Sequence, residues 1–156
     1  MAYTSLVWPA LDYASSVYDP YLNKNILSIE KVQRREARWV QSDYHWNRSV
    51  TAMLCDLQWP TLSCRREVSR LKTFYNAIYN NSALKIPHYF MTTTYATRHQ
   101  HPLHFVTPSV RTIFYKYSFF PKTIRDWNNL PTETIESSSL QLFLTKLTNW
   151  IIYFYR

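Results

Sequence analysis

The pattern of apolar and polar positions predicts a mainly helical chain. Between residues 22 and 40 the apolar positions recur at the helical period, and Gln33 interrupts them as a polar position. They are Leu22, Ile26, Ile29, Ala37 and Val40. Basic residues project from the opposite side of the same segment, so the pattern predicts a basic amphipathic helix.

A second basic helix is predicted after the Trp59-Pro60 dipeptide. Thr61 is a suitable cap, and the apolar side of the helix that follows comprises Cys64, Val68, Leu71, Tyr75 and Ile78. Arg65, Arg66, Arg70 and Lys72 are expected on its other side. The arrangement of charge in the first basic helix is thereby repeated.

Three shorter helices are predicted elsewhere in the chain. Residues 6–17 have one apolar face, which comprises Leu6, Val7, Ala10, Tyr13, Ala14 and Val17. Ser49 is an N-cap for a helix through Leu57 with Val50, Met53, Leu54 and Leu57 facing inward, and residues 122–130 form another helix with Pro121 near its start.

The carboxyl-terminal part of the chain changes character twice. Residues 87–108 lack a helical period and indicate a loop, with candidate strands at 103–107 and 112–117. A last helix starts after the Ser137–Ser139 caps and has an apolar face of Leu140, Phe143, Leu144, Leu147 and Ile151. The expected fold is a small bundle of about five to six helices with a loop-rich insertion near residues 88–117 that could hold two strands. Its segments are a helical basic region (1–86), an irregular region (87–117) and short terminal helices (118–156).

The net charge favours a polyanionic partner. The 156 residues include 18 Lys and Arg against 10 Asp and Glu, for a net charge of +8. Candidate nucleic-acid-binding residues lie on the two basic helices, because cations on one helical face can meet successive phosphates. They are Lys24, Lys31, Arg34, Arg35, Arg38, Arg65, Arg66 and Arg70. The alternative is a solvated face that keeps a helical bundle soluble.

Other candidate chemistry is sparse. His99, His101 and His104 form an HxHxxH pattern, but no acidic or thiol partner lies nearby, so a solvated loop is expected and no metal or cofactor. Cys55 and Cys64 form no disulfide framework. No apolar run is long enough to span a membrane, and the start lacks the features of a secretion signal, so a nuclear or cytoplasmic location is expected. Among the aromatic residues, Tyr44 and Trp46 beside Arg48 are the cluster that could stack on bases, and core packing explains most others.

Glycine is absent from the chain, although average usage of roughly 7% would supply about eleven. Glycine commonly ends helices and occupies turns with positive φ. Asn80–Asn81, Asn128–Asn129 and the eight prolines are expected to take these positions. Each non-glycine residue in the left-handed region costs on the order of 1 kcal/mol.

Four sequence blocks carry a resemblance to a known family. Residues 6–21 read LVWPALDYASSVYDPY, 30–40 read EKVQRREARWV, 49–67 read SVTAMLCDLQWPTLSCRRE and 118–131 read SFFPKTIRDWNNLP. In this order and spacing, the chain resembles the thumb and post-polymerase region of reverse transcriptases from non-LTR (LINE-like) retrotransposons.

The resemblance implies roles for particular residues. Lys31, Arg34, Arg35 and Arg38 match the basic helix of a thumb that grips the template–primer duplex, and Arg65 and Arg66 match paired arginines after the Trp-Pro turn. The block with Phe119, Phe120, Pro121, Trp127 and Leu130 matches a packing element. Trp8 and Gln58 depart from the family, which usually has a basic residue and a glycine there.

The resemblance also implies that this chain has no catalysis of its own. A polymerase palm needs closely placed carboxylates for two divalent ions, and the five aspartates include no adjacent pair. The expected function is that of a non-catalytic fragment of an RNA-directed DNA polymerase from a transposable element, with at most weak, sequence-independent binding to duplex or RNA–DNA hybrid. The alternatives are a protein-interaction remnant that contacts a missing polymerase core or itself, and an unselected reading frame without function.

Overall fold

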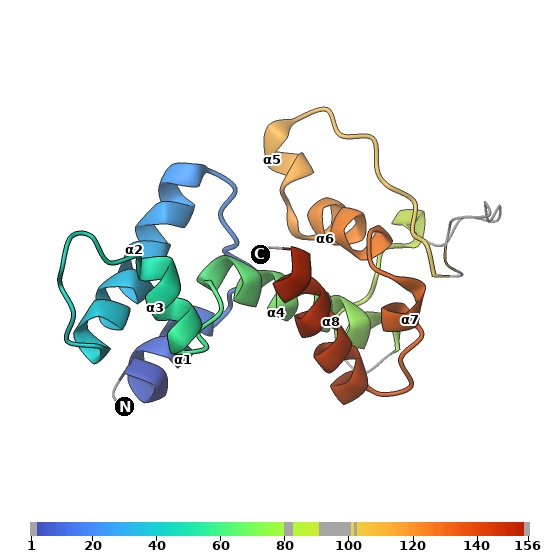
Figure 1. The fold of residues 1–156 in the computed structure, drawn as a ribbon. Coiled ribbons are helices and arrows are strands. Elements are labelled where there is room, and N and C mark those ends of the chain that lie inside the picture. The colour runs from blue at the N-terminus through green and yellow to red at the C-terminus, as the bar shows by residue number, and fades with distance from the viewer. Residues whose placement is uncertain (1–2, 80–82, 91–100, 102, 155–156) are drawn as a thin grey trace. The chain divides into compact units, whose positions relative to one another are not determined.

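The computed structural model is mainly helical, as the sequence predicts. It describes the chain except residues 1–2, 80–82, 91–100, 102 and 155–156 (Figure 1). The chain divides into two compact units, residues 1–67 (unit 1) and 68–156 (unit 2), and the boundary falls within a helix. This boundary differs from the segment limits at 86 and 117 that the sequence suggests.

Unit 1 contains a short π-helical turn, η1 (Tyr3–Val7), followed by α1 (Trp8–Asp12), α2 (Asn23–Val40) and α3 (Val50–Asp56). The helix α4 (Leu62–Ile78) begins in unit 1 and ends in unit 2. The predicted caps are confirmed, because Ser49 Oγ accepts from the backbone N–H of Ala52 and Thr61 Oγ1 accepts from that of Cys64. Local side-chain chemistry therefore fixes where α3 and α4 begin.

The core of unit 1 forms where η1, α2, α3 and the Trp-Pro turn meet. Its buried residues are Tyr3, Ala37, Met53, Leu54 and Trp59. Of the six residues on the apolar face predicted for residues 6–17, Val7 is half-buried and the other five are exposed, among them Leu6, Tyr13 and Val17 at 71%, 80% and 85%. The helix of α1 stops at Asp12, so the later residues do not continue its face, and Tyr3 fills the core instead.

Unit 2 contains the rest of α4, then η2 (His88–Phe90), α5 (Ile113–Lys116), α6 (Phe119–Asn128), α7 (Thr132–Ile135) and α8 (Leu140–Phe154). The strand predicted at 112–117 is wrong, because Thr112 accepts from the N–H of Tyr115 and starts the helix α5. At 103–107 the described residues show one bridge position, Phe105, and no strand. Part of the predicted insertion, residues 91–100 and 102, lies outside the described residues.

Aromatic rings build the core of unit 2. Trp127 is fully buried, with its ring centroid 5.3 Å from that of Phe74 and 5.9 Å from that of Phe143. Its Nε1–H donates to the carbonyl of Leu103 (3.0 Å). Phe143, Leu147 and Ile151 are buried along α8, as their spacing predicts. The tryptophan thus joins α4, α6, α8 and the loop in one core.

Three non-glycine residues, Ala14, Ser42 and Gln58, have positive φ angles of 51° to 55°. Asn128 and Asn129 end α6, as predicted, but Asn129 has φ −88°, so this helix ends without the left-handed conformation. Asn80–Asn81 lies outside the described residues. At Gln58 the backbone N–H groups of Gln58 and Trp59 bond the carbonyls of Cys55 and Leu54 (2.9 and 2.8 Å), which closes α3 in the motif that usually has glycine.

Replacing Gln58 by glycine is expected to stabilise unit 1 by about 0.5–1 kcal/mol. The left-handed conformation costs a residue with a Cβ atom about 1–2 kcal/mol, and the greater freedom of glycine in the unfolded chain offsets part of the gain. Urea unfolding measures the change. The control is Gln58→Ala, which removes the side chain but keeps Cβ and should give no gain; equal stabilisation by both substitutions would contradict the backbone explanation.

Candidate nucleic-acid interface

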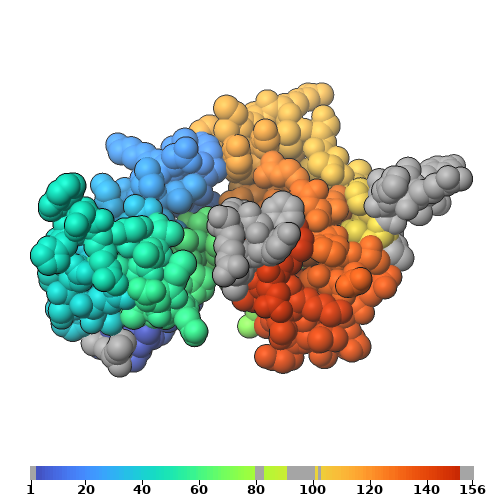
Figure 2. All heavy atoms as spheres, viewed as in Figure 1, coloured from blue at the N-terminus to red at the C-terminus, as the bar shows by residue number. Residues whose placement is uncertain are grey.

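Five cations of α2 form the first candidate surface, which we name the α2 stripe: Lys24, Lys31, Arg34, Arg35 and Arg38. The first four are exposed and Arg38 is half-buried. At 1.5 Å per residue, Lys24 and Arg38 lie about 21 Å apart along the helix, which is about the length of six base pairs. In the space-filling view, α2 and the segment after it form part of the surface of unit 1 (blue to turquoise, Figure 2).

The α2 stripe has no internal partners among the described residues. No ion pair joins any of its five cations to a carboxylate in that part of the chain. On the opposite side of α2, Ala37 and Gln33 are fully buried, and Gln33 donates to the carbonyl of Pro60 (2.9 Å). Ile26, Ile29 and Val40 are half-buried, whereas Leu22 is 51% exposed and the prediction that it faces inward is wrong.

Arg65 of α4 is held inside unit 1. Its guanidinium forms an ion pair with Asp12 and lies over the ring of Trp8, with Cζ 3.8 Å from the ring centroid. Burial lowers the pKa of Arg65 to about 10. The side chain is 17% exposed, so most of its donor surface is already covered. Trp8, where the resembled family has a basic residue, here supplies a stacking surface for a cation.

Arg66 is buried more completely. Its Nε lies 3.2 Å from Asp19 Oδ1, its Nη2 lies 4.0 Å from Glu30 Oε1, and the side chain is 3% exposed. Glu30 also accepts from the backbone N–H groups of Leu62 (3.3 Å) and Ser63 (2.8 Å). A carboxylate at these first N–H groups of α4 is favoured by the helix dipole. Arg66 therefore belongs to an internal network that fixes the start of α4.

Arg70 is likewise buried in an ion pair, within unit 2. Its guanidinium pairs with Asp126 of α6, and the residue is 2% exposed. The prediction that Arg66 and Arg70 project to solvent is wrong, because acids distant in the sequence hold them inside. Of the predicted apolar face, Leu71 and Tyr75 are buried as expected, whereas Cys64, Val68 and Ile78 are half-buried. The other buried residues of α4 are Leu62, Arg66, Arg70, Phe74 and Ala77. Neither arginine can contact a phosphate without unfolding its surroundings, so both leave the candidate surface.

This internal pairing sets the electrostatics of unit 1. The unit has eight Lys and Arg and seven Asp and Glu, a net charge of +1. Three of its acids, Asp12, Asp19 and Glu30, face the arginines of α4. Their charge is neutralised inside the unit, so the α2 stripe is a local positive surface even though the whole unit is nearly neutral.

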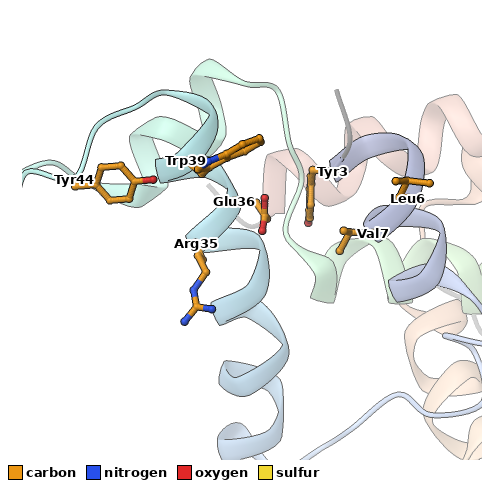
Figure 3. Close-up of a pocket in the computed structure, with 7 residues that line it drawn as sticks. All are labelled: Tyr3, Leu6, Val7, Arg35, Glu36, Trp39 and Tyr44. Carbon is orange, nitrogen blue, oxygen red and sulfur yellow. The ribbon is translucent and has the colours of Figure 1, made fainter.

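A groove lies beside the α2 stripe. It has a volume of about 520 Å³, which is in the usual range for small-molecule sites. The residues that line it are Tyr3, Leu6, Val7, Arg35, Glu36, Trp39 and Tyr44. Figure 3 shows the Glu36 carboxylate directed toward the Tyr3 ring, Trp39 above them, and the guanidinium of Arg35 pointing away along the helix. Most of these residues carry no motif and are absent from the sequence-based candidates.

The aromatic cluster proposed for stacking is only partly in place. Tyr44 lines the groove and is 62% exposed, whereas Trp46 is 91% exposed and does not line it. Arg48 pairs with Asp43 and Asp56, with 3.4 Å between the charged atoms of each pair. Trp39 could have indicated the groove from the sequence, because it is an aromatic residue that follows Arg38 and does not belong to the apolar side of the helix.

The histidine pattern is not a solvated loop as predicted. His101 is 6% exposed, and the centroids of the His101 and His104 rings are 5.7 Å apart. The segment is held inward because Phe105 and Asn128 exchange two hydrogen bonds (3.1 and 2.9 Å). Burial, and then the nearby His104, lower the pKa of His101. His99 lies outside the described residues, within which no group of three potential metal ligands occurs.

Comparisons give no independent assignment of the chain. Within the described residues, no helix is both long and apolar enough to cross a membrane. The resemblance to reverse transcriptases still depends on the four sequence blocks alone. Neither a protein-family model, nor a curated protein, nor a solved structure matches this chain.

Proposed function

We propose that this chain is a non-catalytic fragment related to the thumb region of a non-LTR retrotransposon reverse transcriptase, and that it binds duplex or hybrid nucleic acid weakly. The α2 stripe carries the proposal, because its five cations share one helix and have no ion-pair partner among the described residues. Lys31, Arg34, Arg35 and Arg38 also lie in the block that resembles the thumb helix.

The binding expected from this surface is sensitive to salt and indifferent to sequence. Cations on one helical face displace condensed counterions from phosphates and read no base edges. If all five cations contact phosphates, the logarithm of the binding constant for duplex DNA should fall with the logarithm of the salt concentration with a slope no steeper than about −4.5. With the arginines of α4 buried, the surface is smaller than the sequence predicts, so the affinity should be correspondingly low.

Reversing two charges of the α2 stripe, as in Lys31→Glu with Arg34→Glu, is expected to weaken duplex binding at least tenfold. Both side chains are exposed and neither lines the groove, so the fold and the groove should be retained. The salt slope should become shallower by about 2, since roughly one contact is lost per residue. A gel-shift titration at several salt concentrations measures both effects.

The matched control makes the same change of charge in unit 2. Lys85→Glu with Lys116→Glu replaces two exposed cations there. This variant keeps all five cations of the α2 stripe, whereas the stripe variant loses two of them. The control should therefore bind duplex at least severalfold more tightly than the stripe variant. Equal weakening by the two pairs would show that net charge, and not the α2 stripe, determines binding, and would contradict the proposed surface.

A second candidate function is protein association through the start of unit 1. Leu6, Tyr13 and Val17, close together in the sequence, are more than two-thirds exposed, and large exposed apolar side chains can serve as interaction surfaces. Size-exclusion chromatography with light scattering tests self-association. A clean monomer over a wide concentration range would exclude self-association, and loss of a dimer in Tyr13→Ser with Val17→Ser would locate it.

A further inference from the structure

A residue that lines the groove beside the α2 stripe has a hydrogen-bond donor without a partner. Tyr3 is 2% exposed, yet its hydroxyl is buried without a hydrogen bond. Such a group loses its bonds to water and gains none in return, which costs free energy unless a ligand supplies an acceptor. Burial raises the pKa of Tyr3, and the Glu36 carboxylate adds to the effect while Arg65 opposes it, so the hydroxyl stays protonated at neutral pH.

The groove also contains a carboxylate between flat walls. The Glu36 side chain points toward the Tyr3 ring, and the ring of Trp39 lies above both (Figure 3). Trp39 is 59% exposed, which leaves much of its surface open to a ligand. Trp39, Glu36 and Tyr3 thus line one groove with an aromatic surface, a carboxylate acceptor and a buried hydroxyl donor in its wall. This combination suits a flat ligand whose edge carries an acceptor beside donors.

Two classes of ligand fit an aromatic groove that holds a carboxylate. One is a cationic side chain, such as a methylated lysine, held by cation–π contacts. The other is a nucleobase stacked on an aromatic ring. The surrounding charge decides between them, because Arg34, Arg35 and Arg38 outnumber Glu36 along this part of α2. A cationic peptide would be repelled by these residues, whereas the phosphates of a nucleic-acid strand would be attracted.

We infer that the groove binds one unpaired guanine base of a single strand whose backbone follows the α2 stripe. Guanine alone among the common bases has two adjacent donors, N1–H and the N2 amino group, beside the O6 acceptor. The donors match the two oxygens of Glu36, the acceptor matches the Tyr3 hydroxyl, and the ring can stack on Trp39. The inference rests on the proposed function for its backbone contacts, because the Arg35 guanidinium points outward, where phosphates would lie.

The test compares three fluorescent 11-mers with the full chain at low salt. One is oligo-dT, one has a single central guanine, and one has hypoxanthine there, which lacks only the N2 amino group. Anisotropy should show the guanine strand bound roughly tenfold more tightly than oligo-dT, with the hypoxanthine strand between them, since a bidentate contact discriminates by about 1–3 kcal/mol. Equal affinity for the three strands would overturn the inference.

Two variants assign the preference to the groove. Glu36→Gln keeps the shape but replaces one acceptor by a donor, so the preference for guanine should vanish while oligo-dT binding persists. Trp39→Ala should weaken the guanine strand roughly tenfold and leave a blunt duplex unaffected, because stacking needs an unpaired base. The matched control is Trp46→Ala, an exposed tryptophan outside the groove, which should change nothing. Equal effects of the two tryptophan substitutions would overturn the groove as the site.

The outcomes separate the groove from the α2 stripe. Loss of duplex binding in Lys31→Glu with Arg34→Glu tests the stripe alone, since neither residue lines the groove. If that variant binds duplex normally while Glu36→Gln still removes the guanine preference, the proposed function fails and the groove stands. If a trimethyllysine peptide binds in a Trp39-dependent way and the guanine strand shows no preference, the groove is a cation site and the inference is overturned.

Discussion

Replacing Glu30 by alanine is expected to destabilise unit 1 by about 3 kcal/mol. The substitution removes the acceptor for the N–H groups of Leu62 and Ser63 and one carboxylate beside Arg66, which is 3% exposed. Removing one partner of a buried pair typically costs about 3–5 kcal/mol, because a desolvated charge loses its compensation, and Asp19 retains part of it here. Amide hydrogen exchange in α2 and α3 measures the loss for unit 1 by itself.

Two controls separate burial from charge at Glu30. Glu30→Gln keeps an acceptor oxygen for α4 but no negative charge, so a smaller loss of about 1–2 kcal/mol is expected. Asp56→Ala removes an exposed acid of the same unit, whose pair with Arg48 is solvent-exposed, and should cost less than about 0.5 kcal/mol. Similar losses for Glu30→Ala and Asp56→Ala would contradict the network assigned to Glu30.

The ends of several helices could be predicted from the sequence because they depend on neighbouring residues. Ser49, Thr61 and Ser139 each accept a backbone N–H from three residues ahead, as expected of N-caps. Pro121 lies in the first turn of α6, although that helix begins at Phe119, three residues earlier than predicted. These interactions span a few residues, so sequence patterns contain the required information.

The inward face of α4 could be predicted only in part, at Leu71 and Tyr75. Arginines were assigned to the solvent side, yet Arg66 and Arg70 are more deeply buried than Cys64 or Val68. Their burial depends on carboxylates 47 and 56 residues away, Asp19 and Asp126. A helical period shows which residues share a face, but the identity of the buried face depends on partners brought together by folding.

The residues that line the groove could not be predicted from the sequence for a related reason. Tyr3, Glu36 and Trp39 come from η1 and α2, and their approach depends on how the first residues pack on that helix. The sequence does reveal the α2 stripe, because all five cations share one helix. Local chemistry is therefore predictable here, whereas sites made from two segments require the fold.

The arginines of this chain fall into two physical classes that respond differently to salt. Arg34 and Arg35 are exposed, so added salt should screen their contribution to binding. Arg66 and Arg70 are buried beside carboxylates, where screening is weak, so their contribution to stability should persist. A salt concentration that abolishes nucleic-acid binding should therefore leave the unfolding midpoint nearly unchanged, which separates loss of contacts from loss of fold.

Replacing Asp126 by alanine is expected to destabilise unit 2 by about 3 kcal/mol. Asp126 pairs with Arg70, whose side chain is 3% exposed, and it lies next to Trp127 at the centre of the aromatic core. Without the carboxylate, the guanidinium either stays desolvated with less compensation or moves out and disturbs that core. At a urea dependence of about 1–3 kcal/mol per molar, the unfolding midpoint should fall by about 1–3 M.

The double variant Arg70→Met with Asp126→Ala gives the sharper test. An apolar side chain of similar length restores packing without a charge, so the double variant should be more stable than Asp126→Ala alone. Glu136→Ala is the matched control, an exposed acid of the same unit whose loss should cost less than about 0.5 kcal/mol. Additive losses in the double variant would mean that Arg70 and Asp126 stabilise the unit independently, which would contradict the pairing assigned to them.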